Sequence, residues 1–315
     1  FEDGNLVIQA GNSQYRVYRG LLATYSGVFT GASKSPADAE LVEGFPLVRF
    51  LDPDVEVTPF LKAIFQPDFF MPFPAPTAFD AIVGCLRLSH KYGVGYLHRR
   101  ALVHLSSTYP TKLSTLDAIY FPTGKQDLKP SWKIPPDPTF RICVILLARE
   151  VEATWILPWA FYGLSAKILT KLVLLFSLAM LAIHCLPFDD QAFFLKGHCN
   201  WQTTSTAADA PRFLWHPLNI PGCKDPSGCH TQRLNAMEVV REGLNDGSSV
   251  FFCIWREEEW DCLQSVCPAC LGALRNTHTA TRRAFFDKLP EMYNLPSWAE
   301  LEQLRTAAIG DSPFD

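Results

Sequence analysis

The spacing of apolar residues changes along the first 30 positions of the chain, from strand-like alternation to a helical repeat. Residues 5–10 (NLVIQA) and 14–18 (QYRVY) have the pattern of two short strands, and Gly11-Asn12 between them is a hairpin signal. Helical spacing follows at once in Leu21, Leu22, Tyr25, Val28 and Phe29. These residues predict a β-hairpin that leads directly into a helix with one apolar face.

The next 80 or so residues mix strand and helix signals in the same way. Residues 46–50 (PLVRF) predict a third strand. Thr58 followed by Pro59 predicts the start of a helix, because proline is favoured at the first helical position. Thr77 and Asp80 have the spacing of a capping box ahead of a helix that ends at Gly93. A further helix is predicted from about residue 96 to residue 109.

A hairpin, a helix, a third strand and then paired helices indicate an α+β fold. We expect a small N-terminal sheet packed with helical hairpins, followed by mainly α-helical regions. A helical segment interrupted at Pro158 is predicted over residues 141–164, and Ser297 with Glu300 forms a second capping box. The predicted organisation is a first domain, a proline-rich linker, a helical region and a cysteine-containing, mainly helical domain: residues 1–112, 113–138, 139–200 and 201–315.

A series of residues in the first domain follows a recognisable order: Asp3, Leu6-Val7-Ile8, Tyr15 to Tyr18, Arg19, Leu21-Leu22-Ala23, Ser26, Phe29 and the segment LRLSHKYGV at 86–94. In this order the chain resembles the BTB/POZ domain, most closely the BTB proteins predicted in large numbers in fungi. Their insertion rich in phenylalanine and proline is similar to residues 67–76. The resemblance covers about the first 110 residues, roughly a third of the chain.

The resemblance implies a protein-interaction module that binds itself, a cullin-type ubiquitin-ligase scaffold or transcriptional partners. In the family, Asp3 and Arg19 would correspond to charged groups near the groove of the dimer face; the alternative roles are a turn aspartate and a strand-edge arginine. Two features depart from the family. Tyr18 stands where a histidine is usual, and the helix that commonly precedes the first strand in BTB dimers has no counterpart ahead of this strand.

Composition narrows the classes of partner. The net charge is −4, from 28 basic and 32 acidic residues, and no run of lysine and arginine could follow a phosphate backbone. We therefore expect no nucleic-acid partner. The ten cysteines are irregularly spaced, unlike a secreted disulfide scaffold, and no signal peptide is recognisable. These features predict an intracellular protein of the cytoplasm or nucleus with reduced thiols.

One apolar run raises the question of a membrane. Residues 172–186 (LVLLFSLAMLAIHCL) are 15 in number, whereas a spanning helix needs about 20. Lys171 lies on one side of the run and Asp189-Asp190 on the other. A buried core helix is the interpretation that we favour. A single-pass anchor over residues 168–187, which would make a membrane-anchored interaction protein, and an artefact of gene prediction are the alternatives.

Two cysteine pairs in the last third carry the clearest chemistry, Cys223 with Cys229 and Cys267 with Cys270. Two such pairs can place four thiolates around one zinc ion in a tetrahedral site. The spacing of the second pair is typical, whereas that of the first is wider than usual. His230 could replace Cys229, and Cys262 could replace one member of the second pair. Ordinary buried or exposed thiols without a metal are the alternative.

A redox role is the second interpretation of these cysteines. The motif CPAC (267–270) resembles the thioredoxin type, and Pro268 at a helix start would place Cys267 at the N-cap, where amide dipoles favour the thiolate. The strand before it would have to come from residues 250–255, and no βαβ pattern surrounds it. No other enzyme motif is recognisable. The sequence thus favours a non-enzymatic interaction adaptor, with a thiol-dependent oxidoreductase as the alternative.

Overall fold

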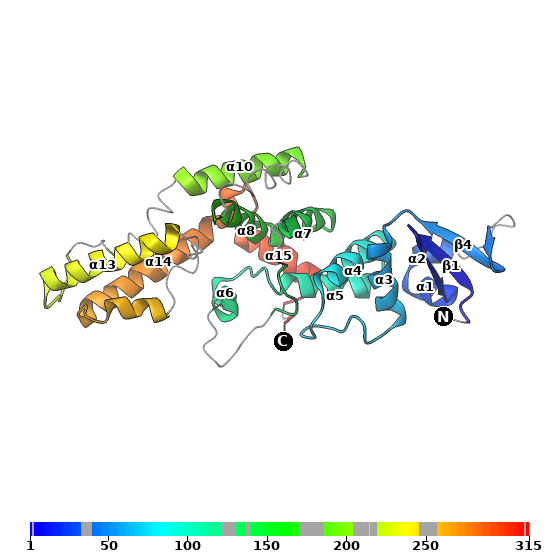
Figure 1. Ribbon diagram of the computed structural model, residues 1–315, viewed down its shortest axis with the longest axis horizontal. Helices are drawn as coiled ribbons and strands as arrows, with labels where there is room; N and C mark the ends of the chain where they lie inside the picture. Colours follow the sequence, from blue (N-terminus) through cyan, green and yellow to red (C-terminus); the bar gives the residue numbers. More distant parts are fainter. Residues whose placement is uncertain are drawn as a thin grey trace.

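The computed structural model describes residues 1, 3–32, 40–120, 130–135, 139–170, 186–203, 214, 219–245, 257–311 and 313–314. It has a four-stranded mixed sheet in its N-terminal part, and mostly helices after it. The predicted α+β class is therefore confirmed. In Figure 1 the described elements form an elongated arrangement, with the sheet at one end and helices α13 (Pro226–Asn245) and α14 (Pro268–Met292) at the other.

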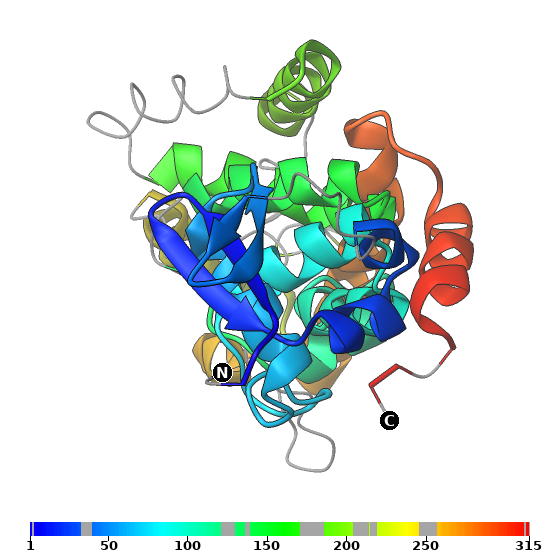
Figure 2. The same ribbon diagram turned by 90° about the vertical axis from the view of Figure 1, so that its right-hand side faces the viewer.

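The sheet has the strand order β2-β1-β4-β3, and Figure 2 shows it from its own end of the molecule. The predicted hairpin is present: β1 pairs antiparallel with β2, and Gly11 turns between them with a φ of 53°. The third predicted strand, β4, runs parallel to β1. The two-residue β3 was not predicted because it is too short for a recognisable pattern. The strands are β1 (Leu6–Ala10), β2 (Ser13–Val17), β3 (Leu41–Val42) and β4 (Phe45–Phe50).

Five helices accompany the sheet among the described residues before position 110. The loop between α4 and α5 turns at Gly93, whose φ of 69° is the left-handed conformation that ends α4, as predicted. At Gly84 a Cβ atom would lie 2.7 Å from the Pro59 ring and from the Glu56 carbonyl, so only glycine allows this approach of α4 to α3. The helices are α1 (Arg19–Tyr25), α2 (Gly27–Ala32), α3 (Asp54–Phe65), α4 (Phe79–Tyr92) and α5 (Gly95–Ser106).

Two predicted helix starts are wrong. Helix α3 begins at Asp54 rather than at Thr58, and Pro59 lies inside it. The acidic residues Asp54 and Glu56 stabilise the earlier first turn through the helix dipole. The capping box of Thr77 and Asp80 does not form, since α4 starts after Ala78 without a side-chain cap.

The predicted linker contains ordered structure. Helix α6 (Leu113–Tyr120) lies within it, and Ser131 and Trp132 are buried. The Ser131 carbonyl accepts a hydrogen bond from the Thr77 amide at 2.7 Å, and the Trp132 indole donates to the His104 carbonyl at 2.9 Å. Residues that read as a loop by composition are therefore fixed to the first domain by contacts distant in sequence.

The helical region begins with α7 (Thr139–Glu150), followed by a short 3-10 turn, η1 (Thr154–Ile156), and α8 (Leu157–Thr170). The interruption predicted at Pro158 lies earlier in the structure, between α7 and η1. There Glu152 has a φ of 59°, and the Ala153 amide bonds back to the Ala148 carbonyl at 2.8 Å. Pro158 is accommodated in the first turn of α8, where its missing amide hydrogen costs nothing.

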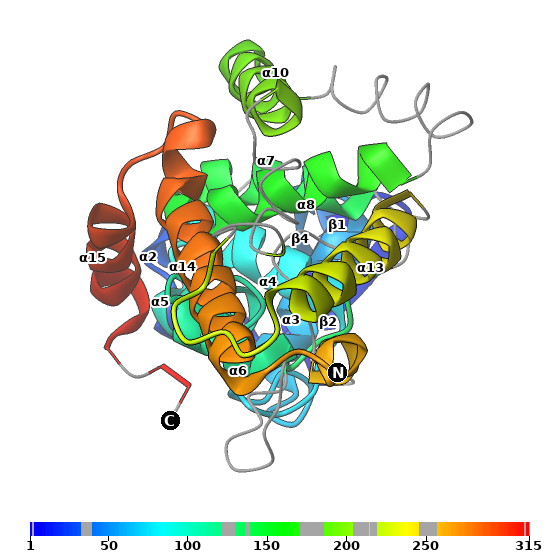
Figure 3. The same cartoon turned by 90° about the vertical axis from the view of Figure 1, so that its left-hand side faces the viewer.

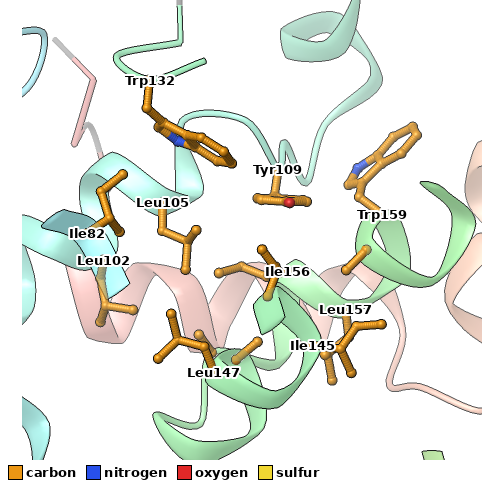
Figure 4. Packing of buried hydrophobic residues seen from close by; sticks show 14 of the residues in the cluster. Ile82, Leu102, Leu105, Tyr109, Trp132, Ile145, Leu147, Ile156, Leu157 and Trp159 are labelled. Atoms are coloured by element: carbon orange, nitrogen blue, oxygen red, sulfur yellow. The ribbon is translucent and has the colours of Figure 1, made fainter. Parts of the chain in front are cut away.

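The apolar core runs without a break from the first domain into the helical region. Figure 4 shows side chains of α4 and α5 packed against those of α7 and α8, around Tyr109, Trp132 and Trp159. A polar contact also joins α5 to η1, since the Trp155 indole donates to the Ser106 hydroxyl at 3.0 Å. The first domain and the helical region thus share one core.

The described residues of the C-terminal part are mostly helical, and Figure 3 shows α13 and α14 at the same end of the molecule. The capping box of Ser297 and Glu300 is confirmed at the start of α15. This last helix returns to the first domain, where Arg99 of α5 donates to the Ile309 carbonyl at 2.8 Å. The additional elements are α10 (Phe188–Thr203), the 3-10 segment η3 (Glu257–Leu263) and α15 (Trp298–Ile309).

Two sequence predictions concern segments outside the described residues. The apolar run at 172–186, except for its last residue Leu186, and the strand candidate at 250–255 both belong there. Among the helices that the structure does describe, none combines the length and the apolar character needed to cross a bilayer.

Candidate metal centre

Four cysteines meet where two helices begin. Cys229 lies in the first turn of α13, and Cys223 lies in the turn that precedes this helix. Cys267 is the N-cap of α14, as predicted, and Cys270 is in the first turn of that helix. Each pair thus supplies one thiol from ahead of a helix and one from its first turn.

The distances suit a single metal ion. The sulfur atoms of Cys223, Cys229, Cys267 and Cys270 all lie within 4.8 Å of one another, and those of Cys223 and Cys267 are 3.9 Å apart. Four thiolates at the usual zinc–sulfur distance form a tetrahedron with edges of about 3.8 Å. The cluster therefore already has nearly the dimensions of a tetrahedral four-sulfur site. Cys229 and Cys270 are buried, and the other two are half-buried.

Backbone amides surround the sulfur atoms. The Cys267 amide donates to the Cys229 sulfur at 3.3 Å. The amides of Lys224 and Cys270 lower the pKa of the Cys267 thiol to about 6, which favours its thiolate form. Such N–H donors stabilise sulfur in its charged form, which is the form that binds metals.

The buried thiols have the opposite tendency. Burial, followed by the neighbouring thiols, raises the pKa of Cys270. The Cys267 amide lowers the pKa of Cys229, but burial and the thiols of Cys267 and Cys223 raise it overall. Four thiols that crowd together cannot all ionise without a cation, whereas a bound metal ion deprotonates its thiol ligands outright. Charge balance in this cluster therefore favours a metal ion at its centre.

The wide spacing of the first pair has a local explanation. Asp225 precedes Pro226, the first residue of α13, and accepts a hydrogen bond from the Gly228 amide at 2.9 Å. An aspartate before a proline is a helix-start signal in the sequence. This signal predicts that a helix begins between the two cysteines. The first turn of that helix then brings Cys229 back towards Cys223.

The two alternative ligands are not part of the cluster. His230 follows Cys229 on α13, so its side chain leaves the helix in a different direction. The Cys262 thiol lies in η3 and donates to the Glu259 carbonyl at 2.9 Å. The structure therefore brings together the four cysteines of the two pairs and neither substitute.

The two candidate partner-binding residues lie far along the chain from the cluster, beside the first hairpin. Asp3 is exposed, and a hydrogen bond from the Tyr18 hydroxyl lowers the pKa of its carboxyl group. Arg19 is the first residue of α1, and its amide donates to the Asn5 side chain at 2.9 Å. Their role in binding a partner stays a prediction.

Comparison with known proteins assigns the chain to no family. No protein-family model, curated protein or solved structure matches the chain.

A site with four sulfur ligands suits a structural metal ion rather than a catalytic one. Four protein ligands complete the tetrahedral shell of zinc, whereas catalytic zinc sites keep one position open for water or substrate. A metal ion here would tie the start of α13 to the start of α14, two segments joined by a long stretch of chain. Such a site stabilises folding, because the unfolded chain does not hold the four ligands together.

Proposed function

We propose that this chain is a non-catalytic protein-interaction adaptor that acts inside the cell. Its N-terminal part would be a BTB/POZ-type interaction module. Its C-terminal part would fold around one structural zinc ion held by Cys223, Cys229, Cys267 and Cys270. The four convergent sulfur atoms are the observation that carries the zinc assignment. The partners would be proteins: a second copy, a cullin-type scaffold or a transcriptional partner.

The arrangement of the first domain supports the interaction role. A hairpin, two short helices, a strand parallel to the first and then packed helix pairs follow one another in the order that the BTB resemblance implies. Part of its surface is apolar and aromatic. The rings of Tyr25 on α1 and Tyr96 on α5 lie 4.9 Å apart, and both side chains are exposed, as is Val28 on α2. Aromatic surface residues are enriched at protein interfaces.

The choice of zinc follows from the ligands. Soft thiolates select zinc, copper(I) or iron–sulfur clusters over magnesium and calcium, and tetrahedral sets of four sulfurs are typical of zinc or iron–sulfur sites. The sulfur atoms lie within 4.8 Å of one another, which is close enough for one shared ion, whereas a cluster with bridging sulfides needs its thiolates farther apart.

Native mass spectrometry of the purified full chain tests both parts of the proposal. The spectrum is recorded for the protein alone, after treatment with a chelator, and after mixing with a cullin-type scaffold. We expect one zinc ion per chain, and an assembly that is either a self-associated form or a complex with the scaffold. Protein without metal would refute the zinc assignment. A monomer that does not bind the scaffold would refute both self-association and the cullin-type scaffold as a partner.

Cysteine variants provide the matched control. Replacing Cys267 and Cys270 together by Ser should abolish the bound zinc and destabilise residues 220–310, while the first 110 residues stay protease-resistant. Cys262→Ser should retain the zinc, because this thiol lies outside the cluster. Unchanged protease resistance of the C-terminal part in the double variant would contradict the structural role.

One observation favours a thiol-dependent oxidoreductase as the second candidate. Cys267 has a pKa lowered to about 6 and sits at the start of α14, which is the setting of a reactive thiol. The same spectra separate the two candidates. Metal-free protein in which Cys267 and Cys270 readily form a disulfide would favour the oxidoreductase, whereas one tightly held zinc would exclude it.

A further inference from the structure

A buried arginine lies beside the four-cysteine cluster. Arg233 is on α13, four residues after Cys229, and side chains with this spacing lie on the same face of a helix. Only 2% of its surface is exposed. The face of α13 that presents a thiol to the cluster therefore also carries a guanidinium group one turn further along.

The guanidinium group is held in place. Its Nε atom donates a hydrogen bond to the carbonyl of Leu214, which is itself buried. Burial lowers the pKa of Arg233, and the nearby thiols of Cys270, Cys229 and Cys223, when ionised, offset part of this effect. The other charged residues adjoining the first pair, Lys224 and Asp225, are exposed and screened by solvent.

The four-cysteine site would carry a negative charge with a metal ion bound, and the Arg233 guanidinium group could offset part of it. One divalent ion with four thiolates has a net charge of −2, and removing that charge from water is costly unless an opposite charge lies near. A carbonyl group such as that of Leu214 orients the guanidinium group but does not neutralise the thiolates. The fixed positive charge of Arg233 is placed to offset part of this negative charge.

We propose that Arg233 is a positioning residue of the metal centre, whose buried positive charge stabilises the four-thiolate site and thereby strengthens its hold on a divalent, thiophilic ion. This inference rests on the proposed zinc site and adds to it a residue outside the ligand set. Groups that support metal ligands in this way usually change metal affinity by about 10- to 100-fold when they are replaced.

Three variants separate the charge from the hydrogen bond and the packing. Arg233→Lys keeps the positive charge, Arg233→Gln keeps a donor for the Leu214 carbonyl without the charge, and Arg233→Met keeps apolar packing volume only. Arg305→Met is the matched control, because Arg305 is a similarly buried arginine on α15 that bonds Glu302 instead. Each full-length variant is titrated with Zn²⁺ against a chromophoric chelator, and Co²⁺ absorption verifies four-sulfur coordination.

We expect Arg233→Gln and Arg233→Met to weaken Zn²⁺ binding by about 10- to 100-fold. Arg233→Lys should stay within a few-fold of the wild type, and Arg305→Met should bind as the wild type does. Equal affinity of Arg233→Gln and the wild type would overturn the inference, as would a lysine variant as weak as the glutamine variant. If the methionine variant does not fold, the comparison of lysine with glutamine decides.

The failure of this inference is distinguishable from failure of the zinc site. Wild-type protein that binds no Zn²⁺ would refute the proposed centre and overturn the role of Arg233 with it. Wild-type protein that binds Zn²⁺ tightly, together with a glutamine variant that binds equally well, would overturn the role of Arg233 alone.

Discussion

Two buried hydroxyl groups join the helical region to the C-terminal part, and their energetic coupling can be predicted. Tyr293 follows α14 directly and is fully buried, with its ring stacked on Phe161 of α8 at 5.3 Å. Its hydroxyl lies 2.9 Å from the Ser165 hydroxyl, also on α8 and also fully buried. Both hydroxyl groups are shielded from water, so the Tyr293 hydroxyl depends on Ser165 for its hydrogen bond.

The two single substitutions should differ in cost. In Tyr293→Phe the Ser165 hydroxyl can turn to the carbonyl of Phe161, four residues earlier in its own helix, so the loss should be about 1 kcal/mol. In Ser165→Ala the phenol hydroxyl stays buried at the end of a rigid ring, and the loss should be about 2 kcal/mol. Replacing both partners removes both polar groups, so the double variant should lose only about 1 kcal/mol.

Urea unfolding followed by tryptophan fluorescence measures these free energies in the full chain. The double variant should be about 2 kcal/mol more stable than the sum of the two single losses predicts. Tyr25→Phe, at an exposed tyrosine, is the control and should change stability by less than about 0.5 kcal/mol. Additive losses within about 0.5 kcal/mol would refute the coupling, and with it the docking of Tyr293 onto α8.

Two more predictions concern carboxylates that join distant elements. Asp190→Ala removes the partner of Arg149, whose Nε atom donates to the Asp190 carboxylate at 3.0 Å. Because Asp190 is buried and Arg149 is a third exposed, the free energy of unfolding should fall by about 2 kcal/mol, and amide hydrogen exchange in α10 should become faster. Unchanged exchange in α10 would contradict this prediction. Burial raises the pKa of Glu302, but hydrogen bonds from Arg305, Thr111 and Lys112 lower it to about 2, below its value of 4.5 in the unfolded chain. The carboxylate therefore stabilises the fold above about pH 4.5, and this stabilisation is lost as the pH falls towards 2. Glu302→Gln should lower the free energy of unfolding at neutral pH and match the wild type near pH 2; an equal difference at both pH values would contradict this.

Features with a local signal were predictable from the sequence. The hairpin at Gly11, the helix end at Gly93 and the capping box of Ser297 depend on residues a few positions apart, so the sequence records them directly. The four cysteines were also found, because paired cysteines are recognisable by spacing. Their convergence on one site was also predicted, but His230 and Cys262 stayed open as alternative ligands, because the wide first spacing is explained only by the helix start at Asp225-Pro226.

Features that depend on distant contacts were missed for a common reason. Thr77 did not become a cap, because its amide bonds the carbonyl of Ser131, which composition had assigned to a linker. Pro59 is tolerated inside α3 because it packs against Gly84 of the neighbouring helix. In both cases a tertiary contact outweighs a local preference of about 1 kcal/mol or more.

The sequence by itself determined the α+β class, most helix and strand positions, and the identity of the four metal-ligand candidates. Only the tertiary structure decided that their sulfur atoms lie within 4.8 Å of one another, that His230 and Cys262 stay outside, and that Arg233 is buried beside them. The physical reason is that helix and turn preferences act over a few residues. Burial and coordination, in contrast, arise from segments that meet only after the chain has folded.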